Sequence, residues 1–110
     1  MKRAASKGKT SGAEWRVRVD LAACYRLVAH FRMTDLIYTH ISSRLPGRAP
    51  RFLINPYGLM FDEITASCLV TVTLDGRIVD DPTGLGINPA GFVIHSAIHG
   101  ARHDVGCVIH

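Results

Sequence analysis

The chain of 110 residues is long enough for one domain, and its 47% hydrophobic and 20% charged residues exclude a wholly disordered protein. The net charge of +4 comes from the lysines and arginine among the first twelve residues, because nine arginines balance nine acids from residue 13 onward. So short a basic stretch does not indicate a specific nucleic-acid site, and no apolar run approaches the roughly 18 residues of a membrane span.

Residues 1–13 are predicted to form a disordered basic leader, followed by one domain over residues 14–110. The leader is polar and lacks the apolar segment of a secretory signal peptide. Cys24, Cys68 and Cys107 are odd in number, form no CxxC pair and have apolar neighbours. This pattern predicts buried thiols in a reducing compartment, the cytoplasm.

Hydrophobic periodicity predicts helices and strands in the order α-β-β-β-β-α-β. A helix is expected over about 14–31, and its apolar face comprises Val17, Leu21, Cys24, Leu27, Val28 and Phe31. Alternation predicts strands over 35–45, 51–56, 68–74, 77–81 and 105–110, with a short helical turn over 62–67 and a second helix over about 92–102.

This order predicts the α/β fold class: a three-layer α/β/α arrangement in which helices pack on a largely antiparallel central sheet. The last expected strand reaches His110 without an outgoing connection, so we expect the sheet to be incomplete at the C-terminus. Uncovered strand edges and apolar faces would then favour aggregation or a homo-oligomer.

Four of the six histidines fall in the last 19 residues. His95, His99 and His103 follow one another at i, i+4 and i+8, so they share one face of the second helix. Two histidines at i and i+4 can bind a metal when another element supplies a third ligand. We favour packing or a subunit interface for this face, and a hydrogen-bonded structural role for His40 over a ligand contact.

Five blocks between about Val19 and His110 resemble the N-terminal half of class II aldolase/adducin domains, especially the adducin-like branch: THISSRLPG, FLINPYGLMFDEITAS, LVTVTLDG, NPAGFVIHSAIH and DVGCVIH. In catalytic members of that family, three histidines hold a divalent, zinc-like metal that stabilises negative charge developing on the substrate. A glutamate serves as acid and base, and small hydroxyl residues with backbone amides hold the substrate phosphate.

The resemblance implies a single metal ligand in this chain, His110, since the family's second histidine would lie two residues further on and the third much later. We therefore expect a divalent metal in family relatives and none bound by this chain alone. The position of the catalytic glutamate falls on Gly91, and the phosphate-binding serines fall on Pro89 and Ala90. No catalytic residue is assigned.

Three residues are weak candidates for substrate contacts by the same resemblance. His40 stands in the turn that approaches the substrate in aldolases, Asn55 lies near a threonine position, and Gly58 matches a glycine that contributes a backbone amide.

Three functions remain open. The chain is expected to be a shortened class II aldolase/adducin-like domain without activity of its own. A longer chain would be a metal-dependent aldehyde-lyase or epimerase acting on a small hydroxy-carbonyl compound. Alternatively, the domain is a non-catalytic binding module, as in the animal relatives associated with actin and the membrane skeleton.

Overall fold

A computed structural model describes residues 11–47 and 49–110. Its elements are α2 (Gly12–His30), β1 (Ile41–Arg44), β2 (Arg51–Ile54), the 3-10 turn η1 (Phe61–Glu63), β3 (Val70–Thr73), β4 (Ile78–Asp80), α3 (Pro89–Ala101) and β5 (Cys107–Ile109). The strands form one antiparallel sheet in the order β4-β3-β2-β1-β5. Both the order of elements and the antiparallel sheet are as predicted.

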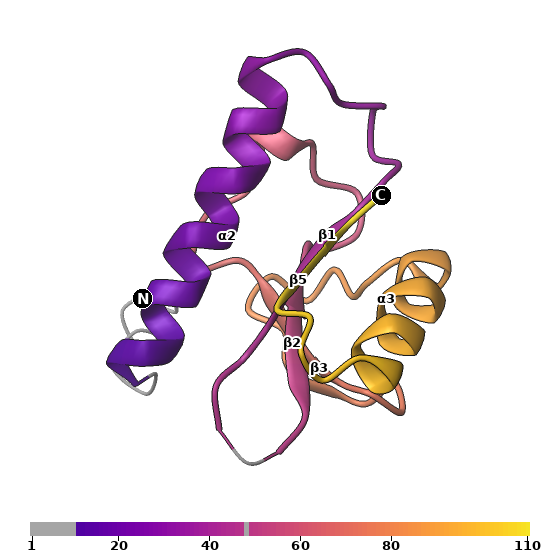
Figure 1. Ribbon diagram of the computed structural model, residues 1–110. Coiled ribbons are helices and arrows are strands. Elements are labelled where there is room, and N and C mark those ends of the chain that lie inside the picture. The colour runs from indigo at the N-terminus through magenta and orange to yellow at the C-terminus, as the bar shows by residue number, and fades with distance from the viewer. Residues whose placement is uncertain (1–10, 48) are drawn as a thin grey trace.

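The sheet lies between the two helices, with α2 on one side and α3 on the other (Figure 1). Successive residues of β2 face opposite sides, as in any strand. Leu53 packs in a cluster with Leu21 and Tyr25 of α2, whereas Phe52 and Ile54 belong to a second cluster that Phe92 of α3 contacts. The predicted three-layer α/β/α arrangement is confirmed.

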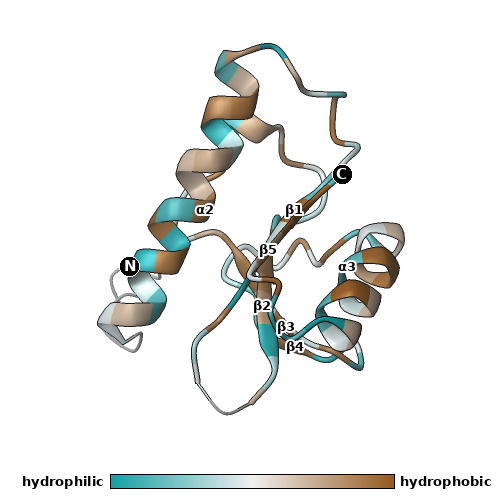
Figure 2. Cartoon of the chain, in the orientation of Figure 1, coloured by the Kyte–Doolittle hydropathy of each residue, from teal (hydrophilic) through white to brown (hydrophobic). Residues whose placement is uncertain are grey.

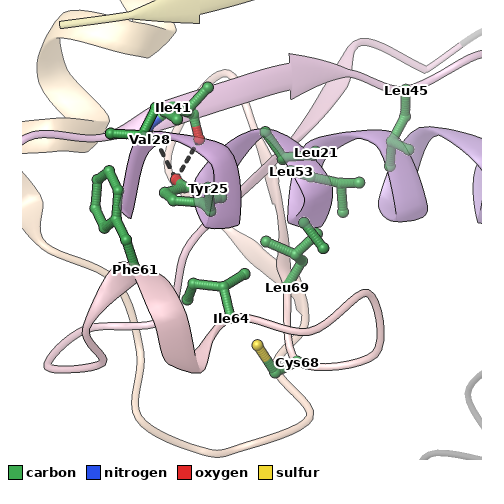
Figure 3. Packing of buried hydrophobic residues seen from close by; sticks show 11 residues of the cluster. Leu21, Tyr25, Val28, Ile41, Leu45, Leu53, Phe61, Ile64, Cys68 and Leu69 are labelled. Carbon is green, nitrogen blue, oxygen red and sulfur yellow. Dashed lines mark hydrogen bonds between the residues drawn. The ribbon is translucent and has the colours of Figure 1, made fainter. Parts of the chain in front are cut away.

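The helix α2 begins where the Ser11 side chain accepts a hydrogen bond from the Glu14 backbone N–H at 3.1 Å. Of the predicted apolar face, Leu21 and Val28 are buried, whereas Leu27 and Phe31 are 55% and 63% exposed. The face that packs carries Tyr25, whose hydroxyl reaches the backbone of Ile41 (Figure 3). The predicted apolar face did not include Tyr25, because a residue with a polar hydroxyl does not count in an apolar pattern. Tyr25 can be buried because backbone groups of Ile41 satisfy that hydroxyl.

Arg18 is the clearest case of a buried polar residue on α2, with no exposed surface. Its guanidinium donates to the carbonyls of Ala66 and Leu69, both at 3.2 Å, and to Thr71 Oγ1 at 3.2 Å. It also lies 3.3 Å from a carboxylate oxygen of Glu14 and of Asp80. Arg18 therefore joins α2 to the segment that enters β3 and to β4.

The predicted strand over 35–45 is wrong in its first half. Leu36 and Thr39 have φ values of 54° and 67°, which belong to the left-handed region and cannot continue an extended strand. The backbone N–H of Tyr38 instead closes a turn onto the Asp35 carbonyl at 2.8 Å. Pairing begins only at His40, so that residue marks the entry to β1.

The predicted leader falls mainly on residues 1–10, outside the described residues. Cys24, Cys68 and Cys107 are free thiols. Cys68 is buried as predicted, Cys24 is only partly buried, and the prediction is wrong for Cys107, which is exposed. Within residues 11–47 and 49–110, no helix combines the length and apolar character that crossing a membrane requires.

Candidate histidine site

The pairing of β1 with β5 places His40 directly opposite His110. The backbone N–H of each residue donates to the carbonyl of the other at 3.2 Å, and the register continues through Ile41 and Ile109. Opposite residues of an antiparallel pair project their side chains to the same face. The two imidazoles accordingly lie with their ring centroids 5.6 Å apart.

The helix α3 adds two buried histidines to this face. Asn88 caps its start by accepting from the Ala90 backbone N–H at 3.0 Å. His95 and His99, one turn apart, have no exposed surface and both meet Ser42 of β1. Ser42 Oγ lies 2.5 Å from His95 Nδ1 and 2.8 Å from His99 Nε2. The predicted packing role is confirmed for His95 and His99, whereas His103 lies beyond the end of α3 and is exposed.

His40, His95 and His110 form a group whose ring nitrogens can meet. One potential ligand atom from each residue lies within 4.8 Å of the other two. Ring centroids are 6.1 Å apart for His40 and His95 and 5.0 Å for His95 and His110. His40 and His95 are buried, whereas His110 is exposed, so the group opens to solvent on the His110 side.

Several ring nitrogens in this region are buried without a hydrogen-bond partner among the described residues. They are both nitrogens of His40, Nε2 of His95 and Nδ1 of His99. Buried polar atoms of this kind normally find partners, because an unmade hydrogen bond costs about 1–3 kcal/mol. The described residues satisfy one nitrogen of His95 and leave its other nitrogen available to a ligand.

Gly91, at the start of α3, makes room for the His40 ring. A Cβ built on Gly91 would lie 2.7–2.9 Å from Nδ1, Cγ and Cδ2 of His40, which is closer than real contacts allow. Any larger residue at position 91 would have to displace the imidazole. The space beside Gly91, the position that resemblance assigns to the catalytic glutamate, is thus occupied by an imidazole.

Burial keeps these imidazoles neutral. It lowers the pKa of His95 to about 3, with smaller contributions from His110, His40 and His99. Burial also lowers the pKa of His99 to about 4, assisted by the nearby Arg44 guanidinium. The pKa of His40 is lowered by burial first and by His110 second. Neutral imidazoles are the form that binds metals and accepts protons.

Arg44 at the end of β1 fixes the C-terminal end of α3. Its guanidinium donates to the carbonyls of His99 at 2.8 Å, Arg102 at 2.9 Å and Val105 at 3.1 Å. A cation that binds the last carbonyls of a helix satisfies orphan acceptors and complements the helix dipole. This contact holds the helix in register with β1 and β5.

The three predicted substrate-contact residues lie in different surroundings. His40 is in the histidine group, as described above. Asn55 is buried, and its Oδ1 accepts from the Tyr25 hydroxyl at 2.9 Å, so it is tied to the residue that also anchors Ile41. Gly58 lies exposed in a turn with a φ of 89°. Their role in substrate binding stays a prediction.

The sequence did not reveal that His95 would lie beside His40 and His110. The i, i+4 spacing of His95 and His99 was visible, but the partner strand of α3 was not. Gly91 was the signal that could have pointed to it, since a residue without a side chain at a helix start often marks a close approach. Ser42, which both helix histidines contact, was not singled out either.

Comparison with known proteins assigns the chain to a family. Residues 19–110 match the family described as Class II Aldolase and Adducin N-terminal domain. The chain is 65% identical to an aldolase II superfamily protein from Pseudomonas syringae, with a TM-score of 0.93 over 94% of this chain and 42% of that one.

Two further proteins represent different branches. An L-fuculose 1-phosphate aldolase from Glaciozyma antarctica is 31% identical, with a TM-score of 0.84 over 98% of this chain and 46% of that one. Alpha-adducin of Rattus norvegicus is 50% identical over 86% of this chain and 13% of its own length. The chain thus spans less than half of each of these relatives. It belongs to the class II aldolase and adducin family.

Proposed function

We propose that this chain is a metal- and ligand-binding part of a class II aldolase/adducin domain that has no aldolase activity of its own. The observation that supports this most directly is the close packing of the His40 ring against Gly91. Gly91, to which resemblance assigns the family's acid/base position, carries no side chain, and the neighbouring His40 imidazole fills the space that one would need. A carboxylate cannot be added there without moving His40.

A divalent metal fits the residues present. His110 matches a metal-binding histidine of the family by resemblance, and it lies beside buried ring nitrogens for which residues 11–47 and 49–110 offer no hydrogen-bond partner. Neutral imidazoles are ordinary ligands for zinc-like ions. When bound, such a metal would act as a Lewis acid toward substrate oxygens. His40 and His95 would line the site and exclude water from its buried side.

The test is an assay for aldehyde release from L-fuculose 1-phosphate, the substrate in the name of the Glaciozyma antarctica relative, and that relative serves as the positive control. We expect no release by residues 1–110 with or without added zinc. Release that is abolished by both a chelator and His110→Asn would contradict the proposal.

A second candidate is a metal-dependent lyase or epimerase formed by a longer protein that contains these residues. The closeness of the His40, His95 and His110 imidazoles supports it, because a metal held by imidazoles could polarise the oxygens of a small hydroxy-carbonyl compound. It is tested by screening a longer protein with unphosphorylated hydroxy-aldehydes and hydroxy-ketones. Turnover by that protein, absent from residues 1–110, would select this candidate, whereas partner binding without turnover would select an adducin-like module.

A further inference from the structure

We propose that His40, His95 and His110 together bind one zinc-type divalent ion, so that this chain holds a three-imidazole site within its own residues. The inference rests on the metal binding proposed above and names its ligands. Only His110 is implied by family resemblance. His40 and His95 are assigned from the structure, and with them the expectation that the chain alone binds no metal is replaced.

The first argument is convergence. The three ligand atoms come from the entry to β1, from α3 and from the end of β5, and lie within 4.8 Å of one another. Zinc–nitrogen bonds of about 2.0–2.1 Å in tetrahedral geometry put ligand nitrogens about 3.4 Å apart. The rings must therefore close by roughly 1 Å or a little more. His110 is the exposed member of the group, so its ring has the most room to turn toward the other two.

The second argument is the state of the nitrogens. His40 has two buried ring nitrogens and His95 has one, all without a partner among the described residues. Both side chains are more than nine-tenths buried. A metal would satisfy one nitrogen of each ring, which is a reason for keeping three imidazoles together where an apolar core could have formed.

The third argument is the support behind His95. When its Nδ1 carries the proton, Ser42 Oγ accepts it at 2.5 Å and can donate its own proton to His99 Nε2 at 2.8 Å. That tautomer leaves the lone pair of Nε2 for a ligand. Histidines that bind metals typically donate their other N–H in this way, which fixes the orientation of the ring.

Gly91 provides a steric probe that changes no ligand. A methyl group at this position would meet the His40 ring at 2.7–2.9 Å and push it away from His95 and His110. If His40 is a ligand, Gly91→Ala will weaken metal binding. In a variant that lacks the His40 imidazole, the same methyl group will have little effect on metal binding.

The experiment measures Zn²⁺ affinity of residues 1–110 by competition with a chromophoric chelator, and Co²⁺ absorption as a report on geometry. One ion per chain and intense visible Co²⁺ bands, typical of tetrahedral sites, are expected. His40→Asn, His95→Asn and His110→Asn are each expected to weaken Zn²⁺ binding by more than about 100-fold. His30→Asn and His103→Asn alter exposed histidines outside the group and are expected to leave the affinity unchanged.

Gly91→Ala is expected to weaken Zn²⁺ binding about 10- to 100-fold, comparable to the loss of a supporting contact. In a His40→Ala background, the same change should alter the affinity by less than about twofold, because the ring it displaces is gone. Circular dichroism of each metal-free variant checks folding. Should His95→Asn unfold, the Gly91 and His40 cycle still decides the assignment.

Failure of this inference can be told from failure of the proposed function. Zn²⁺ binding that depends on His110 but not on His40, His95 or Gly91 would overturn the ligand assignment and leave a metal-binding domain. If the wild-type chain binds Zn²⁺ no more tightly than the His110→Asn variant does, both the ligand assignment and the proposed metal-binding function are overturned. Equal losses for His103→Asn and His95→Asn would indicate nonspecific binding by surface imidazoles and would also overturn the site.

Discussion

At the scale of single residues, the buried imidazoles make the stability of the metal-free fold depend on pH. The pKa values of His95 and His99 fall from 6.5 to about 3 and about 4. Below pH 6.5 the unfolded chain therefore binds protons that the folded chain rejects, so stability is complete above that pH and is lost as the pH falls toward the folded values. Each imidazole contributes about 1.4 kcal/mol per pH unit within that window.

We expect the free energy of unfolding, measured by urea denaturation with a chelator present, to fall by about 2–3 kcal/mol between about pH 6 and pH 5. His99→Gln removes one titrating group and should reduce this fall by roughly half. His103→Asn, which changes an exposed histidine, should keep the full dependence. A stability that is flat over this range would show that the imidazoles are not kept neutral by burial.

At the scale of elements, Arg18 decides how α2 is attached to the sheet. Its guanidinium satisfies the carbonyls of Ala66 and Leu69, which precede β3, and reaches Asp80 at the end of β4. Replacing it leaves two acceptors without their donor in the interior. Buried acceptors that lose a charged donor are costly, whereas the exposed end of the Asp80 ion pair contributes little.

Arg18→Met is expected to lower the free energy of unfolding by about 2–4 kcal/mol, because the methionine keeps the apolar stem but not the hydrogen bonds. Arg16→Met, on the exposed side of the same helix, serves as the matched control and should change stability by less than about 0.5 kcal/mol. Both values come from urea denaturation near pH 7. Equal effects of the two substitutions would refute the attachment role of Arg18.

At the scale of the whole molecule, the distribution of apolar surface favours association. Figure 2 shows hydrophobic residues along the strands and on α3. Val93 and Ile94 of α3 are 63% and 42% exposed, and Ile109 of β5 is 59% exposed. Within the described residues β5 is an edge strand, so its outer backbone groups can pair with another chain.

Residues 1–110 are therefore expected to form oligomers or aggregates at micromolar concentration, measured by size-exclusion chromatography with light scattering. Ile109→Lys places a charge on the β5 edge and should shift the population toward monomer. Leu85→Lys changes an exposed residue of similar character in a loop and should not. A wild-type chain that stays monomeric at these concentrations would contradict this expectation.

The sequence by itself determined the order of elements, the antiparallel sheet and the family, because period-two and helical patterns and turn residues are local properties. The wrong predictions also came from local sequence patterns. The alternation over 35–40 concealed the positive φ values of Leu36 and Thr39, and apolar counting on α2 overlooked Arg18 and Tyr25.

Only the tertiary structure decided which histidines meet. The β1–β5 register sets His40 opposite His110, and the packing of α3 brings in His95 from a helix that follows β1 by more than forty residues. Such contacts depend on strand order and helix placement, which are settled by burial of the whole core rather than by neighbours in the chain. The role of Gly91 also depends on the tertiary structure, because its lack of a Cβ matters only where the His40 ring packs against it.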